Sequence, residues 1–378
     1  MVAIAGVAFA ACAWLTLQAG GTSKHLTLIV IGVGLGLALY HAAFGFTSAY
    51  REAIVARELS GVSAQIVMLI VAMLLFAPLL SAGKVFGHGV GGAYAPVSVS
   101  MTFGAFLFGV GMQLGGGCAS GTLYTVGAGS VRMIATLVMF CAGCLLATLH
   151  WSWWTSLPSA GAISLGRELG WWPAVAVQVV ALLTVYGLLR AVGARNTRSL
   201  WWNGTFSYER LLRGPWPLLL SALLLALLNW AVMLVAGHPW SVTSGLTLWA
   251  GKVASVSGWE STAVIYWSGS GRQAALARSV FLDHTSLTNF GIVMGAFAGA
   301  GLAGRYAPTA RIAKGSWLAA IIGGLMLGYG ARLAYGCNIG AFFSGVSSTS
   351  LHGWVWIVAA LAGNVVGVKL RPRFGLPN

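Results

Sequence analysis

The chain has 378 residues, of which 58% are hydrophobic and only 7% are charged. Because soluble domains carry about 25% charged residues, this composition excludes a water-soluble globule. The 21 Lys and Arg against 6 Asp and Glu give a net charge of +15, and they lie between apolar runs instead of on one polar face. This spacing favours anchoring of cytoplasmic loops over nucleic-acid binding, and attraction of an anionic substrate stays open.

Ten apolar runs approach the length of about 20 residues that a helix needs to cross a bilayer. In chain order they cover 3–19, 26–40, 62–82, 97–113, 131–149, 171–190, 216–236, 288–304, 317–332 and 352–369. Four further stretches, each following such a run, are too short or too glycine-rich to span: 41–56, 116–127, 239–254 and 336–347. Short, glycine-interrupted segments point to transporter binding sites. We therefore predict an all-α polytopic membrane protein, one transport domain over 1–378, with nine to ten transmembrane helices and four short re-entrant helices.

The distribution of Lys and Arg predicts the orientation. Suppose that the N-terminus lies in the cytoplasm and that each short segment enters and leaves the membrane on the same side. The cytoplasmic loops then hold twice as many basic residues as the outer loops. The longest basic loop, 190–213, then lies inside as well. Since Lys and Arg concentrate in cytoplasmic loops, we predict a multi-pass protein in the lipid bilayer with both termini in the cytoplasm.

One motif occurs twice. Residues 109–121, GVGMQLGGGCASG, align without gaps on 328–340, GYGARLAYGCNIG, with six of thirteen positions identical. More weakly, FGFTS at 44–48 resembles WSVTS at 240–244. We predict two inverted repeats, 26–150 and 216–370, joined by a linking helix at 171–190. Two opposed pairs of re-entrant helices then meet at the bilayer centre, as in an hourglass.

The two cysteines of this motif are the leading candidates for function. Cys118 follows Gly117, Cys337 follows Gly336, and each precedes small residues that start a short helix. Free N–H groups at a helix N-terminus bind anions. The alternative is packing, since a free cysteine is commonly buried, but the matched position in both halves favours function. The neighbouring donors Ser120, Thr122 and Asn338 suit a loosely held anion, or they cap helices.

Other chemistry-bearing residues point away from an enzyme. Cys12 and the pair Cys141 and Cys144 lie inside apolar runs, where packing is favoured. The seven histidines show no metal-ligand spacing, so no metal or other cofactor is predicted; His41 and His238 lie at the membrane interface or line a vestibule. All carboxylates fall outside the full spans, and there is no Walker A pattern. Ion coupling and ATP hydrolysis therefore find no support.

The two cysteine loops carry a family resemblance. GGCASGTLY at 116–124 and YGCNIG at 335–340 are similar to the two signature loops of the YeeE/YedE family of bacterial inner-membrane sulfur transporters. The run GMQLGGGC at 111–118 is closest to the YedE branch, which is associated with selenium transport. The resemblance spans roughly 30–370. It implies thiosulfate uptake through transient S–H···S hydrogen bonds between thiols, without cleavage, and it places Cys118 and Cys337 in that relay.

The resemblance also implies a partner and shows one departure. Family members work beside a small soluble sulfur-carrier protein of the TusA type, which the basic inner face would dock. Gly45 stands where thiosulfate-transporting members have a cysteine, so this end of the relay differs. Thr47 and its counterpart Thr243 lie beside the two early short loops.

We therefore predict a permease for a small sulfur-containing anion, with thiosulfate favoured. The alternatives are a permease of the same fold for selenium compounds or other sulfur species such as sulfide or sulfite, and a membrane thiol oxidoreductase or sulfur transferase. The predicted path residues are Cys118, Cys337, Gly117, Gly336, Ser120, Thr122, Asn338, Gly45, Thr47 and Thr243.

Overall fold

A computed structural model describes residues 1–203, 207–306, 308 and 311–378, and within these ranges the fold is all-α apart from one short hairpin. Residues 204–206 belong to the predicted basic loop. Residues 307, 309 and 310 belong to the predicted second repeat. These parts of the two predictions lie outside the described residues.

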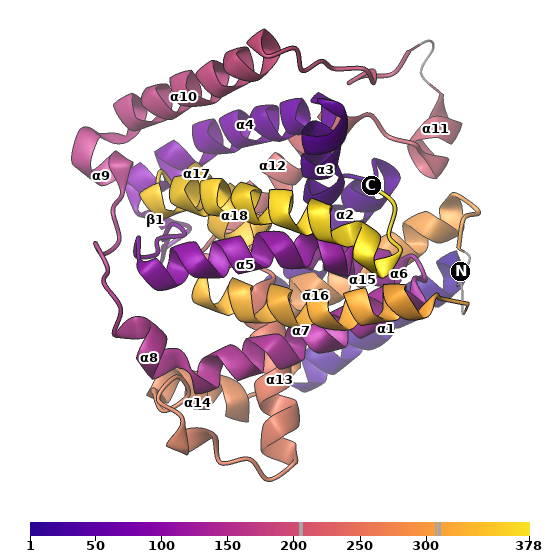
Figure 1. Ribbon diagram of the computed structural model, residues 1–378. Helices are drawn as coiled ribbons and strands as arrows, with labels where there is room; N and C mark the ends of the chain where they lie inside the picture. The colour runs from indigo at the N-terminus through magenta and orange to yellow at the C-terminus, as the bar shows by residue number, and fades with distance from the viewer. Residues whose placement is uncertain (204–206, 307, 309–310) are drawn as a thin grey trace.

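In the residues that the structure describes, ten long helices form the bundle, each on one of the predicted apolar runs (Figure 1). They are α1 (Val2–Gln18), α2 (Ser23–His41), α4 (Ser60–Ala82), α5 (Val99–Gly115), α7 (Val131–Leu149), α10 (Trp171–Ala191), α12 (Leu218–Ala236), α15 (His284–Leu302), α16 (Lys314–Leu333) and α18 (Leu351–Leu370). In the described part of the chain, nine segments are long and apolar enough to cross a bilayer, and α1 is a shorter apolar helix. The predicted all-α polytopic membrane architecture is confirmed.

Four short helical segments follow long helices at the predicted places. They are α3 (Phe46–Ala56), α6 (Ala119–Gly127), α13 (Thr243–Val256) and the π-helix η3 (Asn338–Phe343) with its continuation α17 (Ser344–Ser347). Each is too short to cross a bilayer alone, because about 20 residues are needed. Each also begins after a break in the backbone, so the chain turns between the long helix and the short one.

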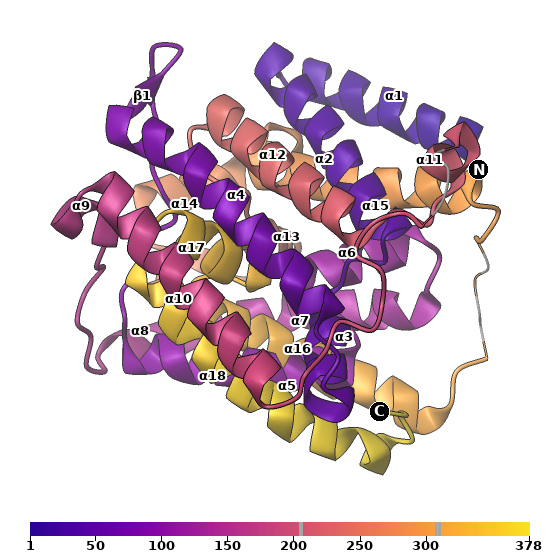
Figure 2. The ribbon, with the colours of Figure 1, turned by 90° about the horizontal axis from the view of Figure 1, so that it is seen from above.

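The remaining elements lie at the two ends of the bundle. They are α8 (Trp151–Thr155), α9 (Leu165–Leu169), α11 (Tyr208–Arg213), α14 (Ser270–Ala277), the 3-10 turns η1 (Ser261–Ala263), η2 (Val280–Leu282) and η4 (Arg371–Phe374), and the antiparallel hairpin of β1 (Lys84–Val85) and β2 (His88–Gly89). In the hairpin Lys84 pairs with Gly89 and Val85 with His88. Both chain termini lie at the same end, opposite α8, α9 and β1 (Figures 1 and 2).

Helices from the two halves of the chain interleave. α2 packs on α15, and α4 packs on α12; α7 packs on α16, and α18 packs on α5. α5 and α16 also pack on each other at the centre (Figure 1). The pairs are symmetric if α2, α4, α5 and α7 of the first half correspond to α12, α15, α16 and α18 of the second. This correspondence converts the α2–α15 pair into α4–α12 and the α7–α16 pair into α5–α18, and it leaves the α5–α16 pair unchanged. The short elements obey the same exchange, since α6 contacts α15 and α17 contacts α4.

Glycine permits the close approach of these helices. A Cβ on Gly32 of α2 would lie 2.6 Å from the Thr288 carbonyl oxygen of α15, and a Cβ on Gly291 would lie 2.6 Å from the Ile29 carbonyl oxygen. Further along the same interface Gly36 faces the Ile292 backbone. Small residues at four-residue spacing let helix backbones touch in a membrane. The glycine stripes of these two helices are therefore packing surfaces.

Candidate functional site

The first glycine-rich loop places Cys118 at the N-terminus of α6. α5 ends at Gly115 and is capped by Gly116, whose φ of +90° is the left-handed conformation that glycine adopts without strain. The Cys118 Sγ accepts a hydrogen bond from the Gly121 N–H at 3.4 Å and lies 3.4 Å from the Ser120 Oγ. The Thr122 hydroxyl donates to the Cys118 carbonyl at 2.8 Å. Cys118 is therefore the N-cap of a short helix, and its neighbours hold its backbone and its sulfur.

The second loop repeats this arrangement around Cys337. The Cys337 Sγ accepts a hydrogen bond from the Ile339 N–H at 3.4 Å and caps the π-helix η3. A Cβ on Gly336 would lie 2.6 Å from the Ala341 nitrogen, so only glycine lets the loop close this tightly. π-Helical turns are rare and frequent at functional sites. The sequence predicts a short helix here but not its π geometry.

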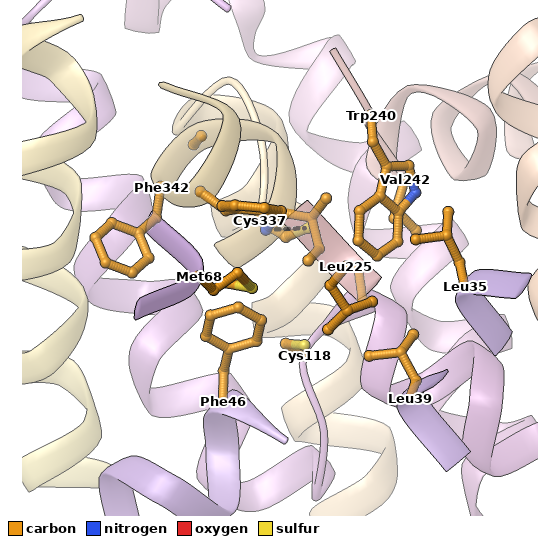
Figure 3. Close-up of a cluster of buried hydrophobic side chains, with 14 of the residues drawn as sticks. Leu35, Leu39, Phe46, Met68, Cys118, Leu225, Trp240, Val242, Cys337 and Phe342 are labelled. Atoms are coloured by element: carbon orange, nitrogen blue, oxygen red, sulfur yellow. Dashed lines mark hydrogen bonds between the residues drawn. The ribbon is translucent and has the colours of Figure 1, made fainter. Parts of the chain in front are cut away.

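Both thiols lie inside one apolar cluster. Cys118 is 2% exposed, and Cys337 is fully buried. Phe46, Met68 and Leu225 belong to the same cluster and lie around the two cysteines (Figure 3). Because these side chains come from α3, α4 and α12, both halves of the chain enclose the thiols. Apolar side chains therefore close the space around the two thiols in this structure.

A cavity of about 100 Å³ adjoins Cys118. Its lining includes four residues that the sequence predicts for the path: Gly45, Thr47, Gly117 and Cys118. Arg51 and Tyr124 also line it. The cavity therefore offers a thiol, a hydroxyl and a guanidinium within one small space, which suits a small anion. Cys337 is not among the lining residues, and the two cysteines do not share this cavity.

Tyr50 and Asn338 connect the first half of the site to the second. The Asn338 Nδ2 donates to the Tyr50 hydroxyl at 3.5 Å, and both side chains are buried. Within the described residues, the Thr47 Oγ1 and the Asn338 Oδ1 are buried without a hydrogen-bond partner. Buried polar atoms are normally paired. These two side chains therefore have hydrogen-bonding capacity that a polar ligand can use.

Two arginines hold the end of α5 that leads into the Cys118 loop. Arg132 donates to the carbonyl oxygens of Leu114 at 2.6 Å and Gly115 at 2.8 Å, and Arg371 donates to the Gln113 carbonyl at 2.7 Å. The last carbonyls of a helix have no partner inside the helix, and positive charge is favourable there. The two guanidinium groups therefore act as a C-terminal cap that orients the loop.

Amide side chains in the long helices position the starts of α3 and α13. The Gln113 Nε2 donates to the Thr47 carbonyl at 3.1 Å, and the Asn229 Oδ1 accepts from the Trp240 N–H at 2.8 Å. The sequence does not predict a role for these amides or for Tyr50. Each amide side chain stands alone inside an apolar run, and this pattern could have indicated a role. Polar residues are rare in membrane helices and usually face the protein interior.

The other predicted residues are more dispersed. Thr243 is the first residue of α13 and is buried. Cys141 and Cys144 are free thiols on α7, which packs on α16. His41 is buried beside Trp216, with 4.9 Å between the ring centroids. His238 lines a different cavity, at the end of the bundle opposite the termini.

Both cysteine loops fall inside a match to a known family. The sequence profile of a family described as sulphur transport matches residues 41–366. The chain belongs to the sulphur transport family. This family member is therefore a multi-pass membrane transporter, and the resemblance that the two loops carry is confirmed.

Relatives cover most of the chain. It is 26% identical over 345 residues to the thiosulfate transporter TsuA of Spirochaeta thermophila, an alignment that covers 89% of this chain and 96% of the relative. It is 24% identical over 355 residues to the thiosulfate transporter TsuA of Escherichia coli, which covers 90% and 93%. A shorter segment of 151 residues is 30% identical to the probable transporter YedE of Escherichia coli. This alignment covers 38% of this chain and 35% of the relative.

Proposed function

We propose that this family member is a permease that takes up thiosulfate through a path containing Cys118 and Cys337. The observation that carries the proposal is the pairing of the two loops, because each places a thiol at the start of a short helix and both thiols belong to one buried cluster. The two relatives named as thiosulfate transporters align over nearly their whole lengths. Thiosulfate is a small dianion with a terminal sulfur, and this arrangement suits both of its ends.

The thiols act as neutral hydrogen-bond donors. Each Sγ already accepts an N–H from its own helix turn, so the S–H hydrogen is left to point at a ligand, and a thiol is a weak donor. An unpaired thiolate among apolar side chains would carry a large desolvation cost. Weak donation suits a permease, because an anion that passes through must be held briefly and then released.

Polar groups beside the thiols hold the oxygens of the anion. The Thr47 hydroxyl, which has no partner among the described residues, supplies a donor near the first loop. The Asn338 Nδ2 donates one of its two N–H groups to Tyr50, and its second N–H supplies a donor near the second loop. Ser120 and Thr122 keep the first loop in shape through Cys118. Gly117 and Gly336 allow the backbone to approach the ligand, and Arg51 supplies positive charge beside Cys118. No covalent bond to the substrate forms or breaks.

Residues 26–150 and 216–370 serve as inverted repeats on either side of a linking helix at 171–190. The exchange of helix pairs described above supports this division. So does the paired glycine packing, because Gly109 of α5 faces the Ala360 backbone of α18 and Gly328 of α16 faces the Phe140 backbone of α7. In transporters built this way, the binding site lies at the interface of the repeats.

The end that carries both termini faces the cytoplasm of a bacterial inner membrane. This end holds the described residues of the basic loop, 190–203 and 207–213, where Arg198 pairs with Glu52 at 2.9 Å. An excess of Lys and Arg marks cytoplasmic loops. The same basic face docks a small sulfur carrier of the TusA type, which removes the delivered sulfur species. Cross-linking of purified permease to such a carrier, weakened by salt, tests this docking.

A second cargo is favoured by one residue. Gly45 lines the cavity beside Cys118 and offers no side chain to it, although the resemblance implies a cysteine at this place in thiosulfate-transporting members. A permease of the same fold for a selenium compound or another sulfur species is therefore the second candidate.

Growth on thiosulfate as the sole sulfur source tests the proposal. The change is Cys118→Ala or Cys337→Ala in cells that lack other thiosulfate permeases. We expect either change to abolish growth, because each removes one donor of the relay. Cys118→Ser keeps an N-cap acceptor of similar size, so its folding is retained while its sulfur donor is lost.

Cys144→Ala is the matched control. It removes a buried thiol from α7, outside the two loops, and we expect growth at the wild-type rate. Undiminished growth of both the Cys118→Ala and the Cys337→Ala cells would refute the proposed path.

A further inference from the structure

A second cavity adjoins the one beside Cys118. It measures about 170 Å³ and lies among the turn before α3, α3 itself, the start of α4, the basic loop and the start of α12. Gly45 and Ser48 line both cavities, so the two spaces lie on either side of this short segment. The second cavity is at the end of the bundle where Figure 1 shows α3 and both termini.

Gln65 brings an unused hydrogen-bonding group to this second cavity. Its side chain lies on α4 and is 3% exposed, and within the described residues its Nε2 has no hydrogen-bond partner. A glutamine amide carries two N–H donors, and buried polar groups are normally paired. The cavity has room for several water molecules or for one small dianion, and either would accept from the Gln65 amide.

Charged residues of opposite sign also line the second cavity. Arg198 donates to the Glu52 Oε1 at 2.9 Å, and their side chains are 61% and 26% exposed. Because exposed ion pairs contribute little to stability, an anion in the cavity can replace the Glu52 carboxylate on the guanidinium. The nearby Glu58 carboxylate is occupied by backbone and hydroxyl donors and does not line the cavity.

The lining of the two cavities together is positive. Arg51 lines the cavity beside Cys118. Of the described residues that line either cavity, Arg51 and Arg198 are therefore the cations and Glu52 is the carboxylate. An anion that leaves Cys118 toward the end with the termini thus stays close to a guanidinium group along this route.

We infer that the cavity lined by Gln65, Arg198 and Glu52 is an inner release site, where the amide and the guanidinium bind the oxygens of the anion after it leaves Cys118. The inference rests on the proposed function, since it assigns the next binding site of the same anion. Charged and neutral N–H donors recognise the oxygens of a small oxyanion. The Glu52 carboxylate competes for Arg198 and repels the anion, so binding stays weak enough for release.

The KM for thiosulfate, measured separately from each face of the membrane, tests the release site. Inside-out and right-side-out vesicles come from cells whose only thiosulfate permease is this protein, and the probe is labelled thiosulfate. Gln65→Met keeps a side chain of similar length but removes the amide. In inside-out vesicles thiosulfate meets this cavity first, so we expect the KM to rise about fivefold, because one hydrogen bond is lost. The KM in right-side-out vesicles should not change.

Glu52→Gln should act in the opposite direction. It removes the competing charge and leaves Arg198 to the anion, so we expect the KM in inside-out vesicles to fall about threefold. Glu209→Gln is the matched control, because Glu209 pairs with Arg213 at the same end of the bundle but does not line the cavity. It should leave both KM values as in the wild type.

Two further measurements separate binding from a structural role of Gln65. Because the Gln65 amide donates to no described residue, Gln65→Met should unfold in detergent at the wild-type temperature or above it. Ile66→Met changes the next residue of α4, which is buried but does not line the cavity. It should leave the KM unchanged from both faces.

An unchanged KM for Gln65→Met in inside-out vesicles would overturn the release site, because the amide then binds only water. An equal rise from both faces, or an equal rise with Ile66→Met, would overturn it as well. A KM that does not fall with Glu52→Gln contradicts the part assigned to Arg198, whether or not Gln65→Met folds. Absence of thiosulfate transport by wild-type vesicles from either face contradicts the proposed function instead.

Discussion

At the scale of single residues, the sulfur of Cys118 combines two roles. It accepts the Gly121 N–H as a helix cap, and in the proposed path its hydrogen is donated to the anion. The same holds for Cys337 and the Ile339 N–H. Replacing a capping residue by alanine costs about 0.5–2 kcal/mol, so loss of transport in an alanine variant needs a stability measurement beside it.

The Gly45 position allows a direct test of cargo choice. A Cβ on Gly45 would lie 2.8 Å from the Ser48 Oγ, a side chain that can rotate, and 3.8 Å from the Tyr124 hydroxyl. Gly45→Cys therefore fits and adds a third thiol beside Cys118. We expect Gly45→Cys to lower the KM for thiosulfate by about fivefold, because one weak hydrogen bond is added. The measurement is thiosulfate uptake, with sulfite and selenite as competing anions.

Gly45→Ser is the control for Gly45→Cys, because serine has nearly the same shape but lacks sulfur. An equal gain in both variants would show that the thiol is not what discriminates between anions at this position.

The two cysteines could be found from the sequence because their motif is repeated with identical spacing. Tyr50 could not, since a tyrosine in a short helix carries no pattern that points across the molecule to Asn338. The cavity that His238 lines together with His25 and His284 was also out of reach. His25, His238 and His284 are separated by some 260 positions along the chain, and only the packing of α2, α12 and α15 brings their rings together.

At the scale of elements, the glycine stripes hold the long helices together. A Cβ on Gly36 would press on the Ile292 backbone of α15, where no side chain can rotate away. We expect Gly36→Ala to destabilise the protein by about 1–3 kcal/mol, as overpacking does. The check is thermal unfolding of the purified protein in detergent.

Gly187→Ala is the control for Gly36→Ala. Gly187 lies on α10, and no atom lies within 4 Å of the place where its Cβ would be. Alanine favours helix over glycine, so this variant should be as stable as the wild type or slightly more so. Equal destabilisation by both changes would mean that glycine flexibility, and not close packing, matters in these helices.

A buried carboxylate joins the basic loop to the start of α4, outside the spans. Glu58 accepts hydrogen bonds from the N–H groups of Ser60 at 3.0 Å and Thr197 at 2.9 Å, and from both of their hydroxyls. Burial alone would raise the pKa of the Glu58 carboxyl, but these hydrogen bonds outweigh it and hold the pKa below its usual value. The ionised form is therefore favoured in the folded protein.

The stability that Glu58 adds depends on pH in a definite direction. Because its folded pKa is lowered, the contribution is complete above the unfolded value of about 4.3 and is lost as the pH falls through the folded pKa. We expect Glu58→Gln to lower stability at pH 7 by about 1–3 kcal/mol and to weaken the acid sensitivity, as measured by thermal unfolding against pH. Glu209→Gln, in an exposed pair with Arg213, should change neither.

The positions of the elements follow from hydropathy, but their internal geometry does not. All ten long helices of the described residues lie on the apolar runs. In the bilayer core the backbone N–H and C=O groups must be hydrogen-bonded within the segment, which a helix achieves. The π-helix after Cys337 and the hairpin at Lys84–Gly89 were not predicted. Both depend on local contacts, such as the closure of the Gly336 loop against Ala341, that leave no periodic signal.

At the scale of the whole molecule, the two halves enclose the thiols from opposite ends. The cavity beside Cys118 is lined by α3 and α6, whereas on the other side the Ser241 Oγ, just before α13, lies 3.4 Å from the place where a Cβ on Gly340 would be, three residues beyond Cys337. Apolar side chains from both halves close the space around Cys118 and Cys337. In the proposed path, transport therefore requires Phe46, Met68 or their neighbours to move when the anion is present.

Uptake of thiosulfate by purified protein in proteoliposomes tests the central claim most directly. The probe is thiosulfate labelled on both sulfurs, with sulfate, sulfite and selenite as competitors. We expect intact thiosulfate, with both labels, to accumulate inside wild-type vesicles but not in those with Cys118→Ala or Cys337→Ala. Accumulation by both variants, or a product with the two labels separated and one sulfur left on a cysteine, would contradict a permease that passes the anion between two thiols.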